Sequence, residues 1–421
     1  MEMTFAEKIL ANYANEKETI PGQIVTVQPA HLLTHDNTAA IIQKVDEELN
    51  KYGVYSKNLS IIVLDHVIPA ASEKTAINHK KIREFVAKHD IKHFYDVGEG
   101  VCHQVVVEKG LALPGKLLLG SDSHTCSYGA VGSFSSGIDR TEAASLMLTG
   151  QTWLKVPQSI KVHIKGSLSK GVYAKDVILH IIGDISASGA TYCSVEYHGE
   201  VEQFSVDDRF TIANMGVEMG AKNSVFFVDD ITKQYLKSIG VNESAYSPVI
   251  PDLGASYMQT LDYDLNNVVP MVACPHTVDN VKPADQLEDI EIHQCLIGTC
   301  TNGRLSDLEI AASILKGKKI HKNVRLLIIP ASKQIFQEAM QKGIIQVLVD
   351  SGGMVLPPGC GPCLGAHQGV LSPGERCLST ANRNFKGRMG SKDAEIYLAS
   401  PATVAATALN QTITDPREVI E

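Results

Sequence analysis

LSIIVLDHVI, at residues 59–68, is a short run rich in β-branched residues that leads into a turn and an amphipathic stretch. The same succession recurs at SIKVHIKG (159–166), NSVFFVDD (223–230) and VRLLIIPAS (324–332). Apolar runs of this length that alternate with helical patterns are typical of parallel strands joined by helices. The sequence therefore predicts an α/β fold with largely parallel sheets.

Two polar breaks divide the chain, KVPQS at 155–159 and VDNVKPADQLED at 278–289. A chain of 421 residues is longer than a single core usually organises. We therefore expect three α/β domains, at residues 1–157, 158–284 and 285–421.

Charge and hydropathy exclude several classes of protein. The 38 Lys and Arg against 47 Asp and Glu give a net charge of −9, which disfavours a nucleic-acid or anionic-membrane surface. No stretch approaches the roughly 20 apolar residues of a spanning helix, and charges interrupt the apolar N-terminus as they would not in a secretory signal. We expect a cytoplasmic protein whose nine cysteines serve packing, metals or catalysis rather than disulfides.

Three cysteines stand out by their surroundings. Cys360 and Cys363 lie in the glycine-rich segment PPGCGPCLG, and Cys300 follows the apolar run HQCLIG. Glycine-rich turns after strands are where open α/β sheets bind ligands. Three soft thiolates suit an iron-sulfur cluster or zinc better than a hard cation. A structural zinc site with Cys295 or Cys377 as fourth ligand, or a redox pair, remains open on spacing alone.

Nine short motifs follow one another along the chain: DHVIP (65–69), VCHQV (101–105), GSDSHT (120–125), VEYHG (195–199), TIANMGVEMGA (211–221), CTNGR (300–304), GCGPCLG (359–365), NRNFKGRMG (382–390) and YLASPAT (397–403). In this order they resemble the aconitase superfamily, and the resemblance extends from about residue 5 to 417. It implies three α/β/α domains around a 4Fe-4S cluster, one per subunit, with the cysteines in the third domain. We expect the mobile fourth domain of the family to be absent from this chain.

The resemblance also implies roles for individual residues. It assigns as cluster ligands Cys300, Cys360 and Cys363. It assigns to acid–base chemistry and its support Asp65, His66, His103, Asp122, His124 and Glu196. It assigns to substrate binding Ser123, Asn382, Arg383 and Arg388. An iron with only three protein ligands keeps a position open for a hydroxyl, an acid must protonate that hydroxyl as it leaves, and guanidiniums present forked donors to carboxylates.

The implied activity is that of a hydro-lyase that isomerises a 2-hydroxy dicarboxylic acid by removing and returning water. In the family, a serine on the mobile domain takes the carbon-bound proton, and no segment of this chain matches it. We therefore expect a separate small subunit that carries this domain, in a heterodimer or heterotetramer. We expect neither a nucleic acid nor a membrane as partner.

The chain departs from the family pattern at Ala30, at Asp139-Arg140 and at Gln411-Thr412. The charged pair after Gly137 puts the substrate in doubt, because homoaconitate, citramalate and dimethylmalate-type acids differ only in the group attached to a malate core. Each methylene changes binding by only about 1–3 kcal/mol. A metal-binding regulatory protein is the alternative of a different class, and the acidic composition disfavours it.

Overall fold

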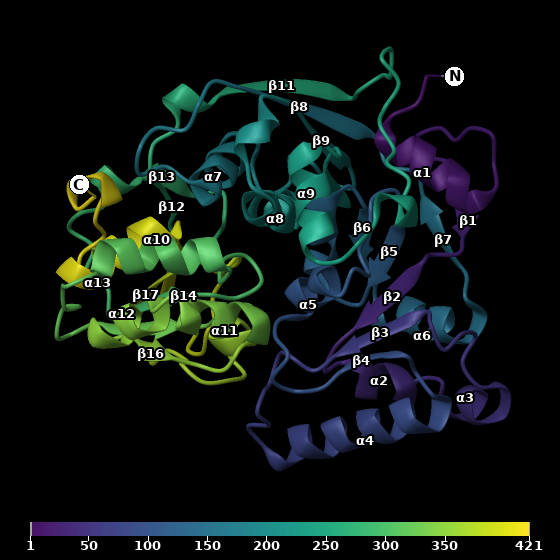
Figure 1. Cartoon of the computed structure of the whole chain (residues 1–421), viewed down its shortest axis with the longest axis horizontal. Coiled ribbons are helices and arrows are strands. Elements are labelled where there is room, and N and C mark those ends of the chain that lie inside the picture. Colours follow the sequence, from purple (N-terminus) through teal and green to yellow (C-terminus); the bar gives the residue numbers. More distant parts are fainter. Residues whose placement is uncertain (1, 421) are drawn as a thin grey trace.

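The computed structural model describes residues 2–420, whose strands form three larger sheets and one antiparallel pair. In Figure 1 the N-terminal part (purple to blue) and the C-terminal part (green to yellow) lie on opposite sides, with the middle of the chain (teal) between and above them. Among the helices of the described chain, none combines the length and apolar character needed to cross a membrane.

The first sheet has five parallel strands in the order β4-β3-β2-β5-β6. Its strands are β2 (His31–Thr34), β3 (Ser60–Val63), β4 (His93–Tyr95), β5 (Leu117–Gly120) and β6 (Phe134–Gly137). Its helices are α2 (Thr38–Gln43), α3 (Asp46–Tyr52), α4 (Glu73–His89), α5 (Cys102–Glu108) and α6 (Arg140–Thr149). Ile61 and Val63 pack into one hydrophobic cluster and Ile62 into another, so the predicted run is buried on both faces, as a central parallel strand requires.

The second sheet has four parallel strands in the order β10-β9-β8-β11. Its strands are β8 (Ser159–Lys165), β9 (Ser194–Gly199), β10 (Asn223–Phe226) and β11 (Gln259–Asp264). Its helices are α7 (Ala174–Ile185), α8 (Val206–Asn214) and α9 (Asp230–Ser238). α1 (Phe5–Ala14) precedes the antiparallel pair of β1 (Ile24–Val27) and β7 (Thr152–Lys155).

The third sheet has the order β13-β12-β18-β17-β14-β15-β16. Its parallel strands are β14 (Gln294–Ile297), β15 (Arg325–Ile328), β16 (Met354–Val355), β17 (Arg376–Ser379) and β18 (Glu395–Leu398), and its antiparallel edge is β12 (Met271–Ala273) and β13 (Val281–Pro283). Its helices are α10 (Leu305–Leu315), α11 (Lys333–Gln341), α12 (Ile344–Asp350) and α13 (Pro401–Asn410). The four apolar runs of the sequence contain β3, β8, β10 and β15, so the predicted strands are confirmed. The edge strands of this sheet precede residue 285, and the two predicted domain boundaries stay predictions.

Backbone contacts join the first sheet to the third along a seam at residues 99–101 and 331–333. The amide of Val101 donates to the carbonyl of Ala331 at 2.8 Å, and that of Lys333 donates to Glu99 at 2.9 Å. Gly100 lies between them with φ of +136°, and a Cβ there would lie 2.5 Å from the carbonyl oxygen of Ala331. The close approach therefore requires glycine.

We predict that Gly100→Ala lowers the free energy of unfolding by roughly 2 kcal/mol or more, because it adds a clash with backbone to an unfavourable φ. Urea titration followed by circular dichroism measures this. Gly98→Ala is the matched control, since Gly98 has φ of +94° but a Cβ added there would meet no atom within 4 Å. Equal losses in the two variants would contradict close packing at the seam.

Candidate active site

Loops from both sides of the seam enclose one cavity of about 220 Å³. Cys300 lies three residues after β14, and Cys360 and Cys363 flank the start of the short 3₁₀ helix η7 (Gly361–Leu364). All three are buried, and all three line the cavity together with Cys102. Cys295 and Cys377, the alternative fourth ligands, lie in β14 and β17 and do not line it.

The spacing of the three thiols is a criterion for whether they can bind a single metal ion. Ligands of one tetrahedral zinc lie about 3.8 Å apart, given a Zn–S bond near 2.3 Å. In the part of the chain that the structure describes, only His35, Asp36, Asp65 and His66 bring three or more donor atoms within 4.8 Å of one another. No three cysteines are among them, so the sulfurs of Cys300, Cys360 and Cys363 do not all lie as close together as the ligands of one tetrahedral ion.

Polar side chains reach two of these sulfurs. The amide of Asn382 donates to Sγ of Cys300 at 3.1 Å, and the guanidinium of Arg388 donates to Sγ of Cys363 at 3.3 Å. The neighbouring Cys360 and then Arg388 lower the pKa of Cys363 well below its ordinary value, although burial opposes the shift. Burial raises the pKa of Cys300 to about 12, so that thiol must lose its proton when it binds metal.

Two buried cations support the loops behind the thiols. The guanidinium of Arg304 donates to the carbonyls of Thr301 at 2.7 Å and Cys300 at 3.1 Å. The ammonium of Lys175 donates to the carbonyls of Thr380 and Ala381, at 2.8 and 2.7 Å, and burial lowers its pKa to about 7. The turn that carries Cys300 is thus held by charge-assisted hydrogen bonds from Arg304, and the turn that precedes Asn382 is held by hydrogen bonds from Lys175. Neither cation was predicted from sequence.

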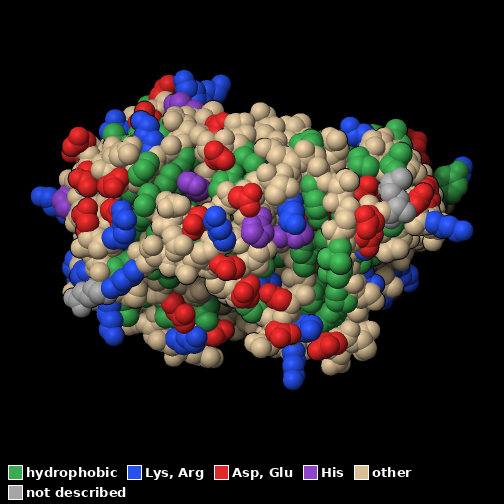
Figure 2. Space-filling model, turned by 90° about the horizontal axis from the view of Figure 1, so that it is seen from above, with side chains coloured by type: hydrophobic (Ala, Val, Ile, Leu, Met, Phe, Trp, Pro, Cys, Tyr) green, Lys and Arg blue, Asp and Glu red, His purple; other side chains and the backbone are tan. Residues whose placement is uncertain are grey.

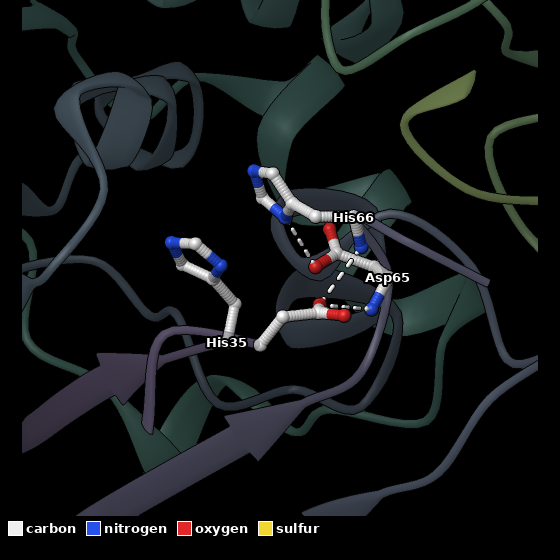
Figure 3. Close-up of side chains that lie close together, drawn as sticks. His35, Asp65 and His66 are labelled. Atoms are coloured by element: carbon white, nitrogen blue, oxygen red, sulfur yellow. Dashed lines mark hydrogen bonds and ion pairs between the residues drawn. The ribbon is translucent and has the colours of Figure 1, made fainter. Parts of the chain in front are cut away.

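Asp65 and His66 follow β3 and form a buried pair, with 2.7 Å between Nδ1 of His66 and Oδ1 of Asp65. Figure 3 shows this contact and the ring of His35 facing that of His66, with centroids 3.9 Å apart. Burial alone would lower the pKa of His66, but Asp65, Asp122 and Asp36 raise it to about 10. Burial and the neighbouring His66 lower the pKa of His35 to about 4. At neutral pH His66 therefore carries the positive charge, and His35 is neutral.

The carboxylate of Asp36 shapes the turn after β3. It accepts the backbone amides of Asp65, His66 and Val67 at 3.0, 2.9 and 3.3 Å, and it lies 2.8 Å from Nε2 of His79. Both of its oxygens are therefore committed to hydrogen bonds within the protein. Three members of the four-residue group, Asp36, Asp65 and His66, are therefore engaged in contacts within the protein.

Asp122 is the acidic centre of the opposite wall, at the start of the 3₁₀ helix η1 (Ser123–Val131). It lies 2.9 Å from Nε2 of His103 and accepts the amide of His124 at 2.7 Å. Although burial opposes it, these contacts lower the pKa of Asp122 well below its ordinary value. Nε2 of His66 lies 3.7 Å from the same carboxylate. Asp122 is therefore close to three predicted histidines, His66, His103 and His124.

One predicted residue lies elsewhere, and another acid takes its place. Glu196 is buried away from the cavity, where it accepts the amide of Phe5 at 3.1 Å and the hydroxyl of Tyr257 at 2.9 Å. Glu218 instead lies 2.9 Å from Nε2 of His124 and accepts Nε of Arg383 at 2.7 Å. Both glutamates stand in motifs of the resemblance, VEYHG and VEMGA. The motifs alone do not show which of the two lies beside the cavity, because burial and side-chain direction are invisible in them.

The predicted substrate-binding residues converge on the cavity. Ser123, Arg383 and Arg388 line it, and Asn382 reaches it through its contact with Cys300. Nε of Arg388 is buried without a hydrogen-bond partner among the described residues. A buried unpaired donor is costly, so the site offers it to a ligand.

A scan against family models matches residues 7–286 and 276–411 to the aconitase family (aconitate hydratase). The chain belongs to the aconitase family. Among curated members, it is 47% identical over 99% of both chains to "3-isopropylmalate dehydratase large subunit 1" of Methanopyrus kandleri. It is 50% identical to "Probable methanogen homoaconitase large subunit" of Methanosarcina mazei, over 92% of this chain and 98% of the relative.

Solved structures support the aconitase-family fold. Holo aconitase X of Thermococcus kodakaraensis aligns with a TM-score of 0.52 at 12% sequence identity, over 90% of this chain and 88% of that one. At this identity the likeness shows the fold alone. The predicted α/β class and the predicted family are both confirmed.

For this aconitase-family site, we predict that Glu218→Gln lowers kcat/KM for hydroxy-acid turnover about 100-fold, because it removes the anion between His124 and Arg383. Glu196→Gln is the matched control, which should lower the melting temperature but keep kcat/KM within about threefold. Steady-state kinetics and thermal unfolding of both variants distinguish a role in turnover from a role in stability. A larger kinetic loss in Glu196→Gln would restore the original assignment.

Proposed function

We propose that this chain is the large, cluster-bearing subunit of a two-subunit hydro-lyase that removes and returns water on a 2-hydroxy dicarboxylic acid. One observation carries the proposal: a single cavity joins the thiols of Cys300, Cys360 and Cys363 to the acid His66 and to two arginines. Family membership and the names of full-length relatives support a dehydratase.

The three thiols would hold a 4Fe-4S cluster. The soft donor character of the three sulfurs and the hydrogen bonds from Asn382 and Arg388 fit such a group. When bound, a cluster with three protein ligands supplies an iron with an open position that acts as a Lewis acid toward a hydroxyl.

His66 would protonate the departing hydroxyl. Its raised pKa keeps it protonated at neutral pH, and Asp65 orients the ring through the 2.7 Å contact. Because hydroxide is a poor leaving group, a positioned acid contributes about 10²–10⁴-fold to such a step. His103, His124 and Asp122 would hold the exchanged water beside it.

Arg383 and Arg388 would bind the two carboxylates of the substrate. Nε of Arg383 donates to Glu218, which fixes the plane of the guanidinium and leaves its terminal donors for a ligand. Ser123 lies on the same wall and would donate a further hydrogen bond. Two forked cations on one side favour a diacid over a monoacid.

The substrate we propose is 3-isopropylmalate, in leucine biosynthesis. Relatives with that name cover the chain completely, as in Thermodesulfovibrio yellowstonii, where a 3-isopropylmalate dehydratase large subunit is 44% identical over 100% of both chains. The second candidate is a homoaconitase, which the 50% identity to the Methanosarcina mazei relative favours. Both share a malate core.

The partner we propose is a small subunit that brings the mobile domain and the serine that takes the carbon-bound proton. The relatives are named large subunits, which supports a partner of this kind. A regulatory, nucleic-acid-binding role is less well supported. On the face shown in Figure 2, Lys and Arg side chains are interspersed with Asp and Glu rather than gathered.

We predict that Cys360→Ser loses the cluster while the fold persists. Anaerobically reconstituted wild-type chain should contain about four irons and four sulfides with a brown absorbance band, and the variant should lose most of both. Cys193→Ala is the control, since Cys193 is buried outside the cavity. One zinc and no sulfide in reconstituted wild type would rule out the cluster.

We predict that the cluster-loaded chain turns over hydroxy diacids only after a family small subunit is added. Formation of the unsaturated acid, followed by its ultraviolet absorbance, measures this against a panel of 2- and 3-hydroxy diacids. Sustained turnover by the chain alone would refute the proposed partner. Failure of every diacid with the assembled pair would refute the function.

A further inference from the structure

Asp139 and Arg140, the charged pair after Gly137, have different structural roles. Asp139 caps α6, accepting the amides of Thr141 and Glu142, the latter at 3.0 Å, while Glu142 accepts the amide of Asp139 in return. Its carboxylate is therefore committed to the helix. Arg140, the first residue of α6, instead lines the active-site cavity.

The end of β6 brings Arg140 to this wall. The amide of Ile138 donates to the carbonyl of Gly120 at 2.8 Å, and a Cβ on Gly137 would lie 2.9 Å from the carbonyl oxygen of Asp122. The strand end is thus pressed against the loop that carries Asp122 and Ser123. The position of Arg140 is a consequence of parallel pairing between β5 and β6.

Arg140 differs from the other two arginines of the cavity. Arg383 pairs with Glu218, and Arg388 donates to Cys363. Within residues 2–420, Arg140 has no hydrogen bond or ion pair, and its side chain is exposed at the edge of the cavity. The site therefore holds one guanidinium more than two substrate carboxylates require.

Apolar side chains are scarce on the same walls. Among the described residues that line the cavity, Val101 and Leu364 are the aliphatic ones, and histidines, arginines, thiols and hydroxyls make up most of the remainder. This chain by itself offers an alkyl group little apolar surface. An unpaired cation beside an alkyl group would also gain nothing from it, whereas a carboxylate would pair with it.

We propose that Arg140 is a specificity-determining residue that binds a third negative group, carried by the substituent on the malate core of the substrate. This inference rests on the proposed function and deepens it, because it orders the candidate acids by charge. On this wall, acids with a carboxyalkyl substituent are favoured over 3-isopropylmalate, which reverses the order that the names of the relatives give to the two candidate substrates.

The test compares Arg140→Ala, Arg140→Lys and wild type in the cluster-loaded pair with a small subunit. The probes are 3-isopropylmalate, 3-(carboxymethyl)malate and 3-(2-carboxyethyl)malate. We expect Arg140→Ala to lower kcat/KM about tenfold for the carboxylated acids and less than twofold for 3-isopropylmalate, with partial recovery in Arg140→Lys. The loss should shrink at high salt, since the cation is exposed. Asp139→Asn, which keeps the cap, is the control and should leave the ratio unchanged.

Four outcomes would overturn the inference. Equal losses for all three acids would place Arg140 on the shared core. Unchanged kinetics with weaker binding of the small subunit, measured by calorimetry, would make Arg140 a docking residue. Turnover of isopropylmalate alone by wild type would leave the proposed function standing and remove the third anion, whereas no turnover of any acid would remove both.

Discussion

The site depends on the close approach of two sheet edges across one seam. The amide of Cys360 donates to the carbonyl of Asp65 at 2.9 Å, so the loop that carries two thiols is fastened directly to the turn that carries the acid pair. Gly100 permits the backbone of the first sheet to touch the third. Because parallel strands end at the same edge, loops from both sheets meet at one cavity.

Charge is balanced around that cavity by a chain of contacts rather than by isolated pairs. Asp36 holds the turn of Asp65 and His66, Asp122 gathers the histidines, and Glu218 links His124 to Arg383. Buried charges are tolerated only when they are paired and hydrogen-bonded, and each of these is. Arg140 is not part of this network, because its side chain is exposed at the edge of the cavity and has no ion pair among the described residues.

Much of this arrangement could be predicted from residues alone. The apolar runs at β3, β8, β10 and β15 are long enough and apolar enough to identify buried parallel strands. The edge strands β12 and β13 were missed, because three-residue strands beside proline carry little pattern. The motifs predicted that Asp65, His66, Asp122 and Arg383 lie at one site, and the structure places them at or beside the cavity. Glu196 lies away from the cavity, because its side chain accepts hydrogen bonds from Phe5 and Tyr257.

The sequence by itself determined the α/β class, the family and the three candidate ligands. Local apolar periodicity and the order of uncommon residues can be read from the sequence alone. Only the tertiary structure decided which glutamate contacts His124 and Arg383, that the three thiols line one cavity, and that Arg140 faces this cavity while Asp139 caps a helix. These are distances between residues far apart in the chain. They arise when sheets pack, and no local pattern records them.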